Sequence, residues 1–140
     1  MTGERREGGC LCGAVRYSLP WPLAMAVSCS CRNCQKQSGA PLSLVGVTMR
    51  DGLEIGGTLA TYVDTAQSGN AVYRQFCPAC GSPVLTDTDA ARAQGVIFIK
   101  GGTLDDATEL RPTVHCWTQS APAWLSFAKG DTIMQRQEGL

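Results

Sequence analysis

Three cysteines lie close together in the stretch C-S-C-R-N-C, at Cys29, Cys31 and Cys34. Thiolates at this spacing can converge on one metal ion from a tight turn, and zinc takes four such ligands in a tetrahedron. A zinc ion with only three protein ligands keeps a fourth position for water or substrate, which is the arrangement of catalytic zinc sites. We therefore expect this three-cysteine cluster to hold a zinc ion that takes part in a reaction. A purely structural zinc is the alternative.

Four further cysteines form two pairs that lie far apart in the chain. Cys10 and Cys12 are two residues apart in extended chain, so their side chains point to the same side. Cys77 and Cys80 form a C-x-x-C pair, and Gly81 after them lets the backbone fold back. Together the two pairs supply four thiolates. The sequence thus predicts a second, structural zinc on this four-cysteine cluster, joining the two halves of the chain.

Composition and charge limit the kinds of protein that this chain can be. Eight cysteines in 140 residues would also suit a disulfide framework, which is the alternative interpretation. The first residues are charged and lack an apolar run, so we expect no signal peptide and a cytoplasmic protein whose thiols stay reduced. Lys plus Arg and Asp plus Glu both total 12, and no apolar stretch is long enough for a bilayer. Neither a nucleic-acid nor a membrane partner is indicated, and the oligomeric state stays open.

The elements that must position these cysteines are short. Apolar segments separated by Gly and Pro turns are typical of a mainly β domain. Residues 32–38 predict one or two helical turns that end at Gly39, which places the three-cysteine cluster at a strand-to-helix junction. Residues 89–94 predict a loop or a single helical turn, and the chain beyond residue 128 is expected to be a loose polar tail. Strands are expected over residues 15–19, 23–28, 42–49, 53–55, 61–64, 71–76, 83–88, 96–100 and 114–118.

Several motifs along the chain together carry a family resemblance. They are G-G-C-L-C-G-A-V-R-Y at 8–17, C-S-C-R-N-C-Q-K-Q-S-G-A at 29–40, F-C-P-A-C-G-S-P at 76–83, and G-G-T-L-D-D at 101–106 followed by His115, Trp117 and A-W-L at 123–125. In these the chain resembles the glutathione-dependent formaldehyde-activating enzyme family, which includes the centromere protein V-like zinc proteins. The resemblance covers residues 8–127 and leaves residues 1–7 and 128–140 as tails. It implies a β-tent of several small coiled antiparallel sheets with minor helix, stapled by zinc.

The resemblance also implies cofactors and an activity. It implies two zinc ions per chain, a structural one on the four-cysteine cluster and a catalytic one on the three-cysteine cluster, which agrees with the spacing. The implied reaction, of the carbon-sulfur lyase type, joins the thiol of glutathione to formaldehyde to give S-(hydroxymethyl)glutathione. The expected partner is then a small thiol such as glutathione. Two alternatives stay open: a non-catalytic zinc module that binds a partner, and the same chemistry on a different thiol or aldehyde.

A few other residues are candidates for contacting the substrate or the metal. Arg32 and Lys36, beside the three-cysteine cluster, could meet a substrate carboxylate or could be solvated surface charges. His115, the only histidine, could donate a hydrogen bond or shuttle a proton in the pocket, or could be a satisfied structural histidine. Cys116 or His115 could also complete the shell of the three-cysteine cluster, although a small buried thiol is the simpler interpretation of Cys116.

Overall fold

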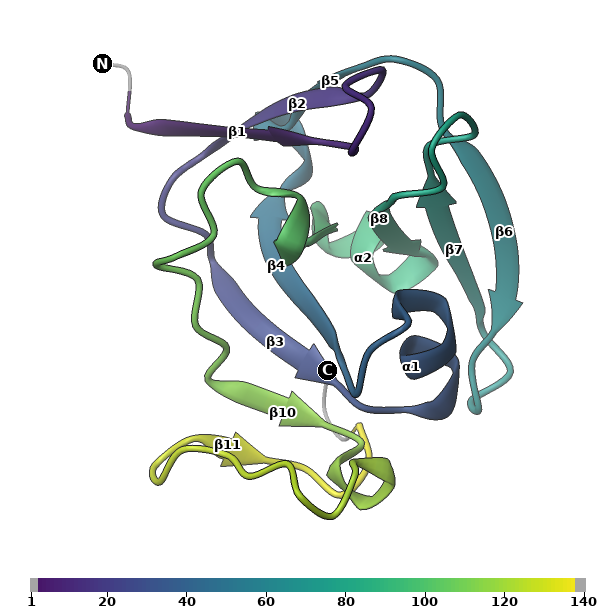
Figure 1. Cartoon of the computed structure of the whole chain (residues 1–140), viewed down its shortest axis with the longest axis vertical. Coiled ribbons are helices and arrows are strands. Elements are labelled where there is room, and N and C mark those ends of the chain that lie inside the picture. Colours follow the sequence, from purple (N-terminus) through teal and green to yellow (C-terminus); the bar gives the residue numbers. More distant parts are fainter. Residues whose placement is uncertain (1–2, 138–140) are drawn as a thin grey trace.

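The computed structural model describes residues 3–137, which form two β-sheets and two short α-helices (Figure 1). The larger sheet has eight strands in the order β11-β10-β3-β4-β9-β8-β7-β6, and the smaller has three in the order β1-β2-β5. The predicted mainly β class with minor helix is confirmed. In chain order the elements are β1 (Arg5–Gly9), β2 (Arg16–Pro20), β3 (Met25–Cys29), α1 (Arg32–Ser38), β4 (Ser43–Met49), the 3-10 turn η1 (Arg50–Gly52), β5 (Glu54–Gly56), β6 (Ala60–Thr65), β7 (Ala71–Phe76), β8 (Pro83–Thr88), α2 (Asp89–Gln94), β9 (Val96–Lys100), η2 (Gly101–Thr103), β10 (Val114–Cys116), η3 (Thr118–Ser120) and β11 (Thr132–Ile133).

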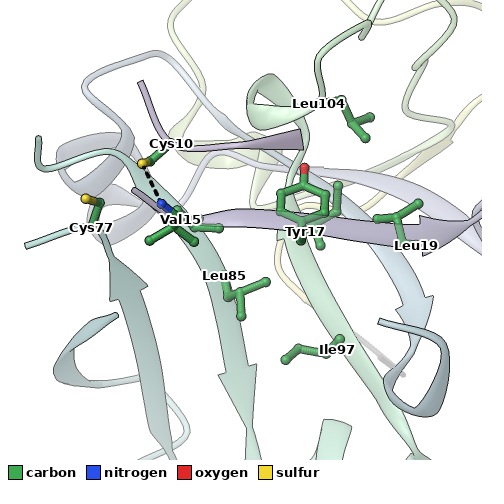
Figure 2. Packing of buried hydrophobic residues seen from close by; sticks show 10 residues of the cluster. Cys10, Val15, Tyr17, Leu19, Cys77, Leu85, Ile97 and Leu104 are labelled. Carbon is green, nitrogen blue, oxygen red and sulfur yellow. Dashed lines mark hydrogen bonds between the residues drawn. The ribbon is translucent and has the colours of Figure 1, made fainter. Parts of the chain in front are cut away.

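The two faces of the larger sheet differ in what covers them. One face packs against the smaller sheet, and Figure 2 shows Tyr17 and Leu19 of β2 in one hydrophobic core with Leu85 of β8. Ile99 of β9 belongs to the same core. Leu85 and Ile99 lie opposite each other in the β8-β9 ladder. Because side chains alternate along a strand, a neighbouring residue such as Phe98 points to the opposite face. That second face lines a cavity instead of the core.

The segments predicted as tails contain strands. β1 begins at Arg5 and pairs with β2 along its whole length, and β11 pairs in parallel with β10. The expectation of a loose segment is therefore wrong at β11. The polar composition of this segment did not indicate a strand, because backbone hydrogen bonds rather than apolar side chains attach β11 to β10. The Met134 N–H, for example, donates to the His115 carbonyl at 2.8 Å. Residues 1–2 and 138–140 of the two tails lie outside the described residues. The domain limits at residues 8 and 127 stay predictions.

Strand β10 lies between β11 and β3 in the larger sheet, next to the three-cysteine cluster. It runs parallel to β3, so that His115 lies opposite Ser28 and Cys116 opposite Cys29. The other pairs within the larger sheet, from β3 to β6, are antiparallel. No helix within residues 3–137 is long and apolar enough to cross a membrane.

Candidate metal centres

The four-cysteine cluster forms where two loops meet. Cys10 and Cys12 come from the β1-β2 loop, and Cys77 and Cys80 from the β7-β8 loop. Their sulfurs all lie within 4.8 Å of one another, with 3.6 Å between Cys10 and Cys12 and 3.8 Å between Cys12 and Cys77. Four sulfurs at about 2.3 Å from a tetrahedral zinc would be about 3.8 Å apart, so the donor set fits zinc in number, chemistry and spacing.

Backbone turns and one serine hold these loops in place. The Cys10 N–H donates to the Val15 carbonyl at 3.0 Å, and Gly81 adopts a positive φ of 78° where the second loop folds back. Ser82, which the sequence did not single out, accepts a hydrogen bond from the Leu11 N–H at 3.0 Å and so connects the two loops. Its hydroxyl also lies 3.2 Å from Cys80 Sγ, and this hydrogen bond is the main cause that lowers the pKa of Cys80 to about 5. A thiolate at Cys80 is the form that binds metal.

Burial distinguishes the members of the four-cysteine cluster from one another. Cys10 and Cys77 belong to the hydrophobic core, and Figure 2 shows both at its edge beside Val15. Cys12 is exposed. The cluster therefore lies at the margin of the core, at the point where the smaller sheet meets β7 and β8. This position agrees with the predicted structural role, which stays a prediction.

The three-cysteine cluster forms at the predicted strand-to-helix junction. Cys29 ends β3, Cys31 is the N-cap of α1, and Cys34 lies in the first turn of that helix. Cys31 Sγ accepts the Cys34 N–H at 3.3 Å, and Gly39 ends the helix in the left-handed conformation with φ of 67°, as predicted. The three sulfurs lie within 4.8 Å of one another. Hydrogen bonds from the Cys29 and Cys34 thiols place the pKa of Cys31 far below its usual value.

Within residues 3–137, no fourth cysteine, histidine or carboxylate joins the three-cysteine cluster. Cys116 is buried and lines the same cavity, but its sulfur is not part of the cluster; burial raises its pKa to about 11. The His115 ring is held on both sides, with Nδ1 2.6 Å from Ser28 Oγ and Nε2 2.8 Å from Asp131 Oδ2. His115 does not line the cavity, so the geometry favours the satisfied structural histidine over a substrate contact.

A large cavity adjoins the three-cysteine cluster. Its volume is about 780 Å³, and the three cysteines form part of its wall. Arg32 also lines it, with an exposed side chain whose guanidinium donates to Gln35 Oε1. Lys36 is exposed and does not line it. Of the two cations proposed for substrate binding, only Arg32 is therefore placed to reach a molecule in this cavity, and its role stays a prediction.

Arg74, on β7, was missed by the sequence analysis. Its side chain is only 6% exposed, and both terminal nitrogens lie 3.8 Å from Cys34 Sγ. Its Nε donates to Asp64 Oδ2 at 2.9 Å, and Asp64 also accepts from Asn33 of α1 at 3.0 Å. Burial opposes the charge of Arg74, but the Cys34 sulfur and the Asp64 carboxylate outweigh it and raise the pKa of Arg74. The β6-β7 hairpin thus brings a paired cation to the cluster.

Lys100, at the end of β9, is a second buried cation that the sequence analysis missed. It is 5% exposed and donates to Ser43 Oγ, and to Gln37 Oε1 at 3.2 Å. No carboxylate among residues 3–137 pairs with it. Burial lowers the pKa of Lys100, while the negative charges of the three-cysteine cluster act in the opposite direction. For both Arg74 and Lys100, the sequence signal that could have indicated a functional role was a charged residue within a predicted strand of mainly apolar residues.

Comparison with known proteins places the whole arrangement in context. The family model described as glutathione-dependent formaldehyde-activating enzyme matches residues 5–120. No curated protein matches the sequence. A crystal structure of a Rhodobacter sphaeroides protein has a similar fold, with a TM-score of 0.55 and 18% sequence identity over 74% of this chain and 91% of that one. The likeness to that structure concerns the fold alone.

Proposed function

We propose, from the premise that this chain belongs to the glutathione-dependent formaldehyde-activating enzyme family, that it catalyses the reversible joining of a thiol to an aldehyde. The carbon-sulfur bond forms between the thiol sulfur and the carbonyl carbon. The π electrons of the carbonyl move to its oxygen, which takes up the proton that the thiol gives up. The reverse reaction is that of a carbon-sulfur lyase. The observation that carries the proposal is the three-cysteine cluster, open to a cavity of about 780 Å³.

We infer that zinc occupies both clusters, because the donor sets are all thiolate and the sulfurs are spaced for one ion each. The four-cysteine cluster would complete a tetrahedral shell and act structurally. Zinc at the three-cysteine cluster would lower the pKa of a substrate thiol in its fourth position and so supply the nucleophile near neutral pH. A reducing compartment such as the cytoplasm would keep the eight cysteines as the free thiols that the structure contains.

The role of Arg74 follows from charge. Three thiolates around a divalent ion carry one net negative charge, which disfavours a further thiolate in the same place. Arg74 places its guanidinium against Cys34 Sγ, and Asp64 holds that guanidinium in position. Lys100 supplies a buried positive charge that is not cancelled by a carboxylate among the described residues. Both cations would therefore stabilise the thiolate form of the cluster and of the bound substrate.

The alternative hypothesis of a non-catalytic zinc module differs from the enzyme hypothesis in the coordination of the three-cysteine cluster. A sealed three-cysteine cluster would support the module, whereas a cluster with an unfilled position would support catalysis. The geometry supports catalysis, because His115 is held by Ser28 and Asp131 and Cys116 stands outside the cluster. Glutathione and formaldehyde, implied by the family description, are the first substrate pair to test.

Magnetisation-transfer NMR can measure the exchange between free formaldehyde and S-(hydroxymethyl)glutathione. The adduct also forms without protein, so the quantity of interest is the acceleration over the protein-free rate. We expect the wild type to accelerate exchange and Cys34→Ser to leave it at the protein-free rate. Equal acceleration by both proteins would contradict a role for the three-cysteine cluster. No acceleration by zinc-loaded wild type would exclude this substrate pair.

A further inference from the structure

The cavity beside the three-cysteine cluster has an apolar floor. The floor is the face of the larger sheet that the core does not cover, and it consists of side chains from β3, β4 and β9. These side chains are Met25, Val27, Val45, Val47, Val96 and Phe98. On a sheet exposed to water this face would carry polar residues, because antiparallel sheets usually alternate apolar and polar side chains across their two faces. An apolar face inside a cavity of about 780 Å³ indicates an apolar ligand.

The rows of the sheet connect this floor to the sulfurs. Cys29 lies opposite Ser43 in the β3-β4 ladder, and the next row on the same face is Val27 opposite Val45. The row after that is Met25 opposite Val47, which in turn lies opposite Phe98. Successive rows on one face are about 7 Å apart. The β9 member of the Val27-Val45 row is Lys100, which donates to Ser43 and Gln37 and does not line the cavity. The apolar surface therefore begins at Val27 and Val45, one row from the three-cysteine cluster, and continues for at least one more row away from it.

The charges in the cavity argue against a strongly anionic ligand. Its charged lining residues are Arg32, Asp64 and Arg74, and the last two pair with each other. Glutathione carries a carboxylate at each end, and Arg32 is the only lining cation without an ion pair among residues 3–137. Formaldehyde carries no substituent that would occupy the floor. The family's implied substrates thus leave the apolar floor without a partner.

We propose that the substrate is a thiol-aldehyde adduct with an apolar substituent, which lies on the apolar floor while its sulfur is at the three-cysteine cluster. This inference rests on the proposed function and specifies its substrate class. The bond changes are the same: the thiol sulfur bonds to the carbonyl carbon, and the carbonyl oxygen takes up the thiol proton. The apolar group can belong to the aldehyde or to the thiol, and the two sources are separable by experiment.

The first experiment compares substrate pairs by NMR exchange with the zinc-loaded protein. One series combines glutathione with acetaldehyde, butanal and hexanal, and the other combines formaldehyde with ethanethiol, butanethiol and hexanethiol. Each methylene buried on the floor should raise kcat/KM about fourfold, the equivalent of about 0.8 kcal/mol. A rise along the first series assigns the apolar group to the aldehyde, and a rise along the second assigns it to the thiol. Acceleration that is equal along both series would overturn the inference and leave the proposed function in place.

The second experiment measures binding without catalysis. Isothermal titration calorimetry of the zinc-loaded protein with the same alkanethiols should show the dissociation constant fall about fourfold per methylene. This dependence without acceleration of any pair would support the apolar ligand class and overturn the proposed function. Dissociation constants that do not change with chain length would overturn the inference.

Variants locate the effect on the floor. The double variant Val27→Thr/Val45→Thr keeps β-branched side chains of similar size but places hydroxyl groups in the row next to the cluster. We expect the ratio of hexanethiol to ethanethiol affinity to fall at least about tenfold from its wild-type value. Val63→Thr is the matched control, because Val63 is exposed on β6 and does not line the cavity. A ratio unchanged in the double variant, with the wild type showing chain-length dependence, would place the apolar ligand elsewhere and overturn the inference.

Discussion

Removing each cysteine cluster separately should show that they differ in what they contribute to stability. The comparison uses two matched double variants, Cys77→Ser/Cys80→Ser for the four-cysteine cluster and Cys31→Ser/Cys34→Ser for the three-cysteine cluster. Each removes two thiols, so neither cluster keeps enough ligands to cross-link the chain. Ser at residue 31 also preserves the helix N-cap, because Ser is among the preferred residues there.

The sequence separation sets the expected size of the two effects. Cys12 and Cys77 are 65 residues apart, and closing a loop of that length in the unfolded chain corresponds to about 4 kcal/mol. The three-cysteine cluster closes only the short loop from Cys29 to Cys34, worth about 2 kcal/mol by the same argument. For a domain of this size, 1 kcal/mol shifts the melting temperature by about 3 °C. The first variant should therefore melt at least about 12 °C lower than the wild type, and the second about 6 °C lower.

Two measurements on the same samples test this reasoning. Thermal unfolding followed by circular dichroism gives the melting temperatures, and elemental analysis gives the metal content. Each variant should lose one of the two metal ions that we infer, and only the first should approach the unfolded state at moderate temperature. Equal losses of melting temperature in the two variants, each short of one ion, would refute the division into a structural and a reactive site.

Three further predictions concern single charged residues. Arg74→Gln should weaken zinc retention in a chelator competition by about tenfold, whereas Arg74→Lys, which keeps the charge, should have a smaller effect. Equal zinc retention by the wild type and Arg74→Gln would show that Arg74 does not influence the metal. Burial opposes ionisation of Asp87, but hydrogen bonds from two arginines outweigh it and lower its pKa, so its contribution to stability is present above about pH 4 and is lost as the pH falls through the lower folded value. Asp87→Asn should thus reduce the free energy of unfolding, measured in urea, by about 1–3 kcal/mol at pH 7 and by less in acid. A larger difference between variant and wild type in acid than at pH 7 would contradict the direction of the pKa shift of Asp87. Asp131→Asn should speed amide exchange at Thr132 and Met134, measured by NMR, because Asp131 connects the segment before β11 to β10.

Local patterns in the sequence were sufficient to predict the strand and the helix that surround the three-cysteine cluster. The helix at residues 32–38 follows from its polar composition and from Gly39, and both features act within a few residues of chain. The cysteine spacings also predicted which sulfurs the structure brings together. Within each motif the backbone of a single turn fixes the sulfur spacing, and the two pairs together offer the four thiolates that one tetrahedral zinc would take.

Features that depend on strand order were not predictable in the same way. Arg74 is 40 residues from Cys34 in the chain, and only the β6-β7 hairpin places it against that sulfur. Lys100 reaches Ser43 across 57 residues through the β4-β9 ladder. The pairing of β11 rests on backbone hydrogen bonds, which leave no trace in side-chain types. A single sequence contains no direct record of which strands become neighbours.

Strand β7 connects the two candidate metal centres. Arg74 of this strand contacts Cys34, and Cys77 follows three residues later in the four-cysteine cluster, with a shift of ladder register between Gln75 and Phe76. An ion that fixes the end of β7 at one centre would also reduce the conformational freedom of Arg74 at the other. By thermodynamic linkage the two centres would then raise each other's affinity by the same factor. Metal uptake by this protein should accordingly be cooperative, with the singly loaded form less populated than it would be for two independent sites.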